Sequence, residues 1–123
     1  MRHAIIIAVL FAGASIAAET HDAVPNQFLG TWAASVAQCS APSTESKLVI
    51  FEKRIAFYES HGPILAMASD SELELALILE LSGEGQVWLD TRQFRLSEDR
   101  QILTDVTGRR QVMTRVRCKG AGE

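Results

Sequence analysis

Leucines occupy alternate positions through one stretch of the chain, at 73, 75, 77, 79 and 81. Glu72, Glu74 and Glu80 fall on the opposite face, so one face is apolar and the other carries charge. Leu, Glu and Ala favour helices, but five matches to a period of two outweigh that propensity. The stretch 72–81 is therefore predicted to be a strand with one buried and one solvated face.

The rest of the chain follows the same all-β pattern. Short segments rich in β-branched, aromatic and leucine residues are separated by regular turn signals. Eight antiparallel strands with hairpin-length connections favour a small up-and-down barrel, and a two-sheet sandwich is the alternative. The other predicted strands are 28–36, 48–51, 54–58, 64–68, 86–96, 102–106 and 111–118.

The N-terminus has the layout of a cleaved signal peptide, residues 1–18. Arg2 and His3 precede an apolar run, and small residues follow through Ala18. Cleavage after Ala17 is favoured over cleavage after Ala18. The apolar run is about half the roughly 20 residues that cross a bilayer, which disfavours a retained anchor. The sequence thus predicts a bacterial periplasmic or secreted protein without a membrane span after processing.

The processed chain is expected to hold one small domain. Residues 19–27 are expected to form a flexible N-terminal segment, and residues 28–119 a single β-barrel domain. Cys39 and Cys118 are the two cysteines, and an exported pair predicts a disulfide, with two buried free thiols as the alternative. In a barrel these positions fall at opposite ends of the closing strand pair, so either the chain after Val36 must fold back or the strands must pair differently.

Charge is distributed unevenly along the chain. Without Arg2 there are 11 basic and 15 acidic residues, a net charge of minus four, which argues against a nucleic-acid partner. Residues 19–90 carry most of the acidic groups and residues 91–123 most of the basic ones. We expect the basic groups near the C-terminus to offset acidic neighbours across the surface, rather than to form a patch that recruits an anionic partner. These groups are Arg109, Arg110, Arg115, Arg117 and Lys119.

The run Phe28-Leu29-Gly30-Thr31-Trp32 resembles the G-x-W signature of lipocalins and related calycin barrels. The resemblance implies that Trp32 packs over one end of the barrel and that a basic residue of the last strand, Arg115 or Arg117, covers it. A guanidinium stacks well on an indole face. The chain is also similar to small uncharacterised secreted bacterial proteins that begin with F-x-G-x-W and end with Arg-Cys. That second resemblance implies no activity.

Candidate chemistry is sparse, and we predict no catalytic, cofactor-binding or metal-binding residues. Ser60 beside His61 is expected to bond locally within a turn. Trp88, Asp90 and Arg92 share one strand face with Phe94 and Leu96. If that face points inward, the charged pair forms a polar spot able to orient a ligand. The favoured interpretation is a bulge that brings both charges to solvent.

Two function classes remain. The first is a non-enzymatic, monomeric envelope protein that binds a protein partner, for example an acidic inhibitor of a cationic lysozyme. The second is a lipocalin-like carrier of a small apolar ligand, with Trp32, Trp88, Asp90, Arg92 and Arg115 as possible barrel-end or ligand contacts. We favour the first, because large side chains are expected to fill an eight-stranded barrel.

Overall fold

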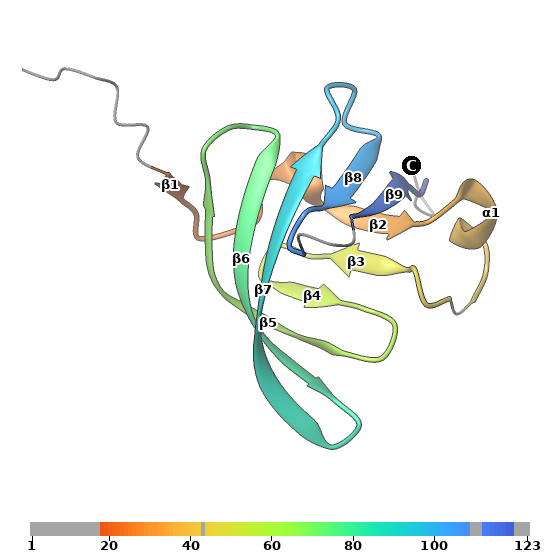
Figure 1. Ribbon diagram of the computed structural model, residues 1–123, viewed down its shortest axis with the longest axis horizontal. Helices are drawn as coiled ribbons and strands as arrows, with labels where there is room; N and C mark the ends of the chain where they lie inside the picture. The colour runs from red at the N-terminus through yellow and green to blue at the C-terminus, as the bar shows by residue number, and fades with distance from the viewer. Residues whose placement is uncertain (1–17, 43, 109–111, 120–123) are drawn as a thin grey trace, which may run out of the picture.

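Eight antiparallel strands close into a barrel in the part of the chain that the computed structural model describes, residues 18–42, 44–108 and 112–119. Consecutive strands pair with each other and the last pairs back with the first, so the predicted up-and-down barrel is confirmed (Figure 1). The barrel strands are β2 (Gly30–Ala33), β3 (Leu48–Ile50), β4 (Arg54–Ala56), β5 (His61–Ser69), β6 (Glu74–Gly83), β7 (Gln86–Leu96), β8 (Ile102–Asp105) and β9 (Met113–Arg117).

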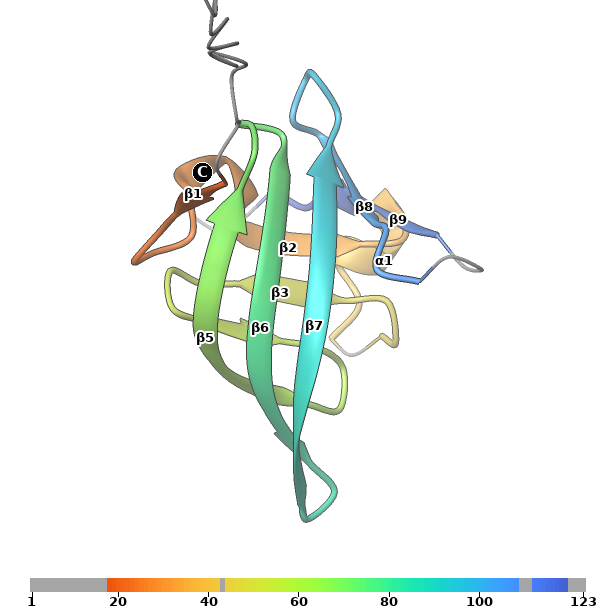
Figure 2. The same ribbon diagram turned by 60° about the vertical axis from the view of Figure 1, so that its left-hand side comes forward.

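The strands differ greatly in length. Figure 2 shows β5, β6 and β7 side by side as a tall wall, with the short β2, β3 and β4 crossing behind it. The β6–β7 hairpin extends past the end of this barrel, and β6 and β7 stay in register over their whole length, from Glu74 opposite Arg95 to Gly83 opposite Gln86.

Alternation along β6 determines what the barrel encloses. Leu75, Leu77, Leu79 and Leu81 are buried, which confirms the strand predicted from their spacing. They pack with aromatic and aliphatic residues of the other strands into one core. That core also contains Phe28, Trp32, Leu48, Ile50, Ile55, Met67, Phe94, Leu96 and Leu103.

The N-terminal segment, which we expected to be flexible, lies along the barrel. Strand β1 (Glu19–Thr20) pairs with the end of β5, and the 3-10 helix η1 (Asn26–Phe28) leads into β2. Val24 between them is buried in the core, and its amide donates to the carbonyl of Glu52. Burial of an apolar side chain and these backbone bonds therefore attach the segment to the barrel.

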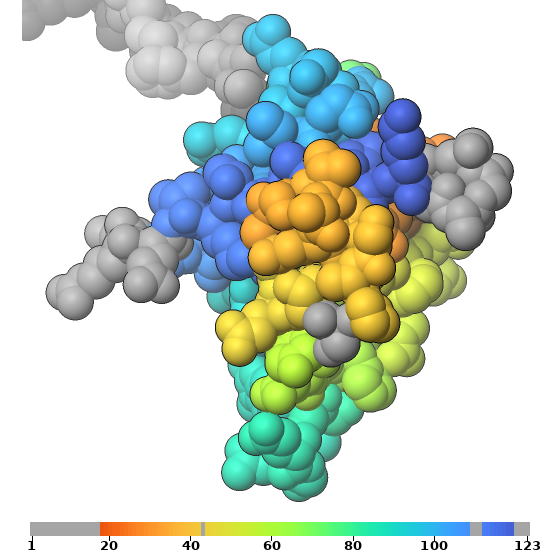
Figure 3. Space-filling model, turned by 90° about the vertical axis from the view of Figure 1, so that its right-hand side faces the viewer, coloured from red at the N-terminus to blue at the C-terminus, as the bar shows by residue number. Residues whose placement is uncertain are grey.

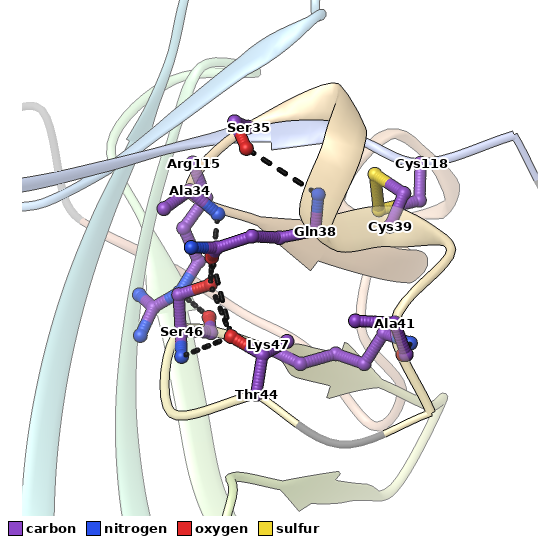
Figure 4. The surroundings of a disulfide bond; sticks show 10 residues. All are labelled: Ala34, Ser35, Gln38, Cys39, Ala41, Thr44, Ser46, Lys47, Arg115 and Cys118. Carbon is purple, nitrogen blue, oxygen red and sulfur yellow. Dashed lines mark hydrogen bonds between the residues drawn. A yellow bond between two sulfur atoms is a disulfide. The ribbon is translucent and has the colours of Figure 1, made fainter.

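The first barrel strand is shorter than predicted, because a helical turn interrupts it. The strand ends at Ala33, and Ser35 caps the short helix α1 (Val36–Cys39) by accepting a hydrogen bond from the Gln38 amide (Figure 4). This turn folds the chain back, as a barrel requires. Cys39 thereby reaches Cys118 just after β9, with their Cα atoms 5.5 Å apart, and the predicted disulfide is confirmed.

At Gly62, β5 lies close against the backbone of β6. A Cβ atom at this position would lie 1.7 Å from the carbonyl oxygen of Glu80, a backbone atom that cannot move aside cheaply. We expect Gly62→Ala to lower the free energy of unfolding by about 2 kcal/mol through overpacking. Urea unfolding followed by tryptophan fluorescence measures the change.

Gly85 in the β6–β7 turn provides the matched control. Its φ of +78° disfavours a side chain, but a Cβ there would have no described atom within 4 Å. Gly85→Ala is therefore expected to cost about 1 kcal/mol, through backbone strain alone. A loss for Gly62→Ala no greater than that for Gly85→Ala would contradict the close-approach explanation.

Candidate functional site

The end of the barrel near η1 is closed by Trp32 and Arg117. The indole of Trp32 is fully buried and donates from Nε1 to the carbonyl of Phe28 at 3.1 Å. The guanidinium carbon of Arg117 lies 4.2 Å from the centre of the indole ring, and its Nη1 donates to the carbonyl of Leu29 at 2.9 Å. Of the two arginines that the lipocalin resemblance offers for this contact, Arg117 makes it and Arg115 does not.

Arg115 instead points into the opposite end of the barrel. The residue is 5% exposed, and its Nε donates to the carbonyl of Ser46 at 2.6 Å. The Ser46 hydroxyl in turn bonds to Gln38 and to the amide of Ala34, so the arginine is held beneath the α1 connection (Figure 4). Burial lowers the pKa of Arg115, Asp105 opposes this effect, and Arg92 adds to it.

Asp90 and Arg92 also face the inside of this end of the barrel. The unbroken β6–β7 register contains no bulge, so that part of the favoured interpretation is wrong, although the side chains of Arg92 and Asp90 remain 29% and 28% exposed. Arg92 donates to Asp90 at 2.9 Å and to Asp105 of β8 at 2.8 Å. Its guanidinium carbon also lies 4.5 Å from the centre of the Phe57 ring.

These contacts shift the pKa values of Arg92 and Asp105 in the stabilising direction. Burial lowers the pKa of Arg92, but the hydrogen bonds to Asp105 and Asp90 outweigh this effect and raise it. Burial raises the pKa of Asp105, but hydrogen bonds from Thr107 and Arg92 lower it below its ordinary value. The Asp105 carboxylate is thus held ionised by protein partners, and the cluster closes this end of the barrel.

The sequence analysis missed two members of this cluster. Asp105 lies on the same face of β8 as the buried Leu103, and alternation alone was sufficient to place it inside. Phe57 follows β4, and its contact with Arg92 depends on how distant strands meet, which no local pattern reveals.

Exposed apolar residues gather on the projecting β6–β7 hairpin. Val87 and Leu89 are 67% and 69% exposed on its outer face, and Trp88 is exposed on the other face. Figure 3 shows the hairpin tip, in teal, extending below the orange and yellow connection between β2 and β3. We call this region the hairpin surface and define it as Ile78, Glu80, Glu84, Val87, Trp88 and Leu89.

The charge around the hairpin surface has one sign. Residues 55–91 contain seven acidic residues and neither Lys nor Arg. Glu72 and Glu74, nearer the other end of the wall, form ion pairs with Arg100 and Arg95. Glu80 and Glu84 are exposed and form no ion pair with any described residue. Arg95 and Arg100 thus offset acidic residues at one end of the wall, whereas no ion pair among described residues offsets Glu80 and Glu84 at the hairpin.

A shallow apolar hollow continues from the hairpin surface over the outer face of β5, β6 and β7. Its volume is about 300 Å³. The hollow exists because the side chains here are small: Ala68 and Ala76 are cross-strand neighbours, and Ala66 lies opposite Ile78. The outer face is therefore apolar over several successive rows of the sheet.

The remaining candidate groups are engaged in local contacts. His21 bonds to the hydroxyl of Ser69 at 2.6 Å, and His61 lies 2.6 Å from a guanidinium nitrogen of Arg54. Within the described ranges, no group of three or more His, Cys, Asp or Glu residues is placed to hold a metal ion, and no helix is long and apolar enough to cross a membrane.

The fold and these sites define the chain as a small disulfide-bonded antiparallel β-barrel. Comparison of the chain with protein-family models, with curated proteins and with solved structures finds no match. Function must therefore be argued from the surface and interior described above.

Proposed function

We propose that this protein is a non-enzymatic, exported binding protein that docks a basic protein on the hairpin surface. The observation that carries the proposal is the combination of exposed Val87, Trp88 and Leu89 with uncompensated Glu80 and Glu84 on a hairpin that projects from the barrel. Exposed aromatic and aliphatic groups supply the area that a partner buries. A surface of one charge sign speeds the encounter with an oppositely charged partner.

A cationic lysozyme is the specific partner that we propose. The disulfide suits an oxidising compartment such as the bacterial periplasm, where an envelope protein meets cell-wall hydrolases. A monomer with one projecting acidic hairpin would act as an inhibitor by covering a basic surface of the enzyme.

The alternative function, transport of a small apolar ligand, has weaker support. Phe28, Trp32 and Phe94 occupy the barrel interior and are almost fully buried. Arg92 and Arg115 lie across the end opposite Trp32. An eight-stranded barrel has little room beyond such side chains.

Charge reversal on the hairpin tests the proposal. We expect the mature protein to bind and inhibit a cationic lysozyme, and the Glu80→Lys/Glu84→Lys variant to bind at least tenfold more weakly. The reason is that the variant replaces attraction by repulsion where the partner docks. Calorimetric titration at low and moderate salt measures the affinity, and a cell-wall lysis assay measures the inhibition.

The control variant is Glu45→Lys/Glu98→Lys, which changes net charge equally at exposed sites away from the hairpin. It is expected to bind within about threefold of the unmodified protein. Equal weakening by both variants would show that net charge alone, and not the hairpin surface, governs binding. Absence of both binding and inhibition would exclude lysozyme as the partner.

A further inference from the structure

Strand β7 has a free edge over more than half of its 11 residues. On one side it pairs with β6 from Gln86 to Arg95. On the other side β8 pairs only with residues 94–96, and one further backbone bond joins the Val106 amide to the carbonyl of Gln93. Residues 86–92 therefore have a strand on one side and, within the described ranges, none on the other. In Figure 2 this edge runs along the lower part of β7.

The direction of the backbone groups along this edge follows from Gln93. Its carbonyl accepts from Val106 and its amide donates to Thr107 Oγ1, so both groups point to the β8 side. Alternate residues of a strand direct their backbone groups to the same side. The amides and carbonyls of Val87, Leu89 and Thr91 thus point toward the free edge, and they have no backbone hydrogen-bond partner among the described residues.

Two features that commonly protect an edge strand, Lys or Pro residues and bulges, are missing here. Natural edges carry Lys or Pro, or contain bulges that prevent pairing with other chains. Residues 86–92 contain neither Lys nor Pro, and the β6–β7 register is regular. The charged side chains of this segment, Asp90 and Arg92, are paired on the inner face. The segment is otherwise rich in residues that favour strands, including Val87, Trp88 and Thr91.

We infer that the basic partner docks by adding an extended segment as a strand along the free edge of β7. This inference rests on the proposed function and specifies how the hairpin surface is used. The backbone groups of Val87, Leu89 and Thr91 would bond to the added strand. Its outward side chains would lie beside Val87 and Leu89. Glu80, the cross-strand neighbour of Leu89, lies two strand spacings away, about 10 Å, a distance that a long basic side chain can span. The chemistry that fits is a segment in which basic and apolar residues alternate.

A pair of synthetic peptides tests the inference on the full mature chain. The first is a capped seven-residue peptide of alternating Lys and Val. The second has the same sequence with its two adjacent central residues N-methylated, which blocks both edges but keeps every charge and side chain. We expect the second peptide to bind at least tenfold more weakly, because it cannot form the backbone ladder. Equal binding of both peptides, or binding of neither, would overturn the inference.

Amide hydrogen exchange gives a residue-level readout. The amides of Val87, Leu89 and Thr91 are expected to exchange fast in the free protein and at least tenfold more slowly with the first peptide. Those of Trp88 and Asp90, which face β6, are expected to be slow throughout. Unchanged exchange at the three edge amides would contradict strand addition. Protection that grows with protein concentration alone would instead assign the edge to a second copy of this chain.

A proline substitution tests the same edge from the protein side. Leu89→Pro removes one edge amide without removing a bond to β6, since proline is compatible with edge strands. It is expected to weaken binding of the first peptide at least tenfold, whereas Leu89→Val changes it less than twofold. If Leu89→Pro does not fold, the comparison of the two peptides still tests the inference. Lysozyme binding with unprotected edge amides would leave the proposed function standing and reject only this inference.

Discussion

Replacing both cysteines, by Cys39→Ala/Cys118→Ala, is expected to lower the free energy of unfolding by about 4 kcal/mol. The disulfide joins residues 79 positions apart, so it closes nearly the whole domain into one loop. In the chain-entropy model, closing a loop of this length stabilises the folded state by roughly 4.5 kcal/mol, mainly by restricting the unfolded chain. Urea unfolding of the variant and of the intact protein measures the difference.

The reduced, unmodified protein controls for packing around the two sulfur atoms. It is expected to be destabilised to the same degree as the double variant, because both lack the same covalent constraint. The location of the bond adds a local test. Since Cys39 ends α1 and Cys118 follows β9, exchange of the Gln38 amide should rise first on reduction. A decrease in the free energy of unfolding below about 1 kcal/mol would show that backbone pairing of the barrel strands, without the disulfide, is enough to hold α1 against the end of β9.

The parts of the fold that follow from local patterns were predictable from the sequence. The leucine alternation in β6 can be interpreted from that one strand, because it requires only that one face is buried. The leucines at 75, 77, 79 and 81 are buried as expected. The disulfide was predicted from the expected export of the chain and from its two cysteines. The bond requires the chain to fold back after Val36, and α1 does this. The sequence did not reveal the helical form of this turn, because four residues carry too weak a periodic signal.

The parts that depend on register were not predictable in the same way. The direction of Asp90 and Arg92 follows from the unbroken pairing of β6 with β7, and from the presence of Asp105 on a neighbouring strand. An isolated charged pair inside a barrel is costly, which made a bulge the reasonable expectation. Asp105, as a second carboxylate partner of Arg92, offsets the cost of placing the charged pair inside the barrel. No feature of residues 86–96 alone predicts that Asp105 lies there.

The free edge of β7 was visible in the sequence as a mismatch of lengths. A strand predicted over 86–96 cannot be covered by a following strand predicted over 102–106. In the structure β7 is likewise much longer than β8, with 11 residues against 4. When two neighbouring strands of a barrel differ in length, the longer one either projects as part of a hairpin or has an uncovered edge. In this chain β7 does both. The difference in strand length therefore accounts for an uncovered edge that no motif in the sequence indicates.

Asp105→Asn is expected to lower the free energy of unfolding at neutral pH by about 3 kcal/mol. The Asp105 side chain is 10% exposed and accepts from Arg92, from the Thr107 amide and from the Thr107 hydroxyl. The variant leaves Arg92 and the buried Arg115 with less compensating charge, and removing one partner of a buried pair costs about 3–5 kcal/mol. Partial exposure of Arg92 places the expectation at the lower end of that range. Urea unfolding at pH 7 measures it.

The pH dependence provides a signature that a packing defect would not reproduce. The pKa of Asp105 is lower in the folded protein than its ordinary value of 3.8, so the unfolded chain binds this proton at higher pH. Its contribution to stability is therefore complete above about pH 5 and is lost as pH falls through the folded pKa. The stability difference between the protein and Asp105→Asn should shrink over that acidic window. Asp70→Asn, at an exposed carboxylate without an ion pair among described residues, should change stability by less than about 0.5 kcal/mol. A difference for Asp105→Asn that stays constant from pH 7 to pH 3 would mean that shape, and not charge, makes Asp105 important.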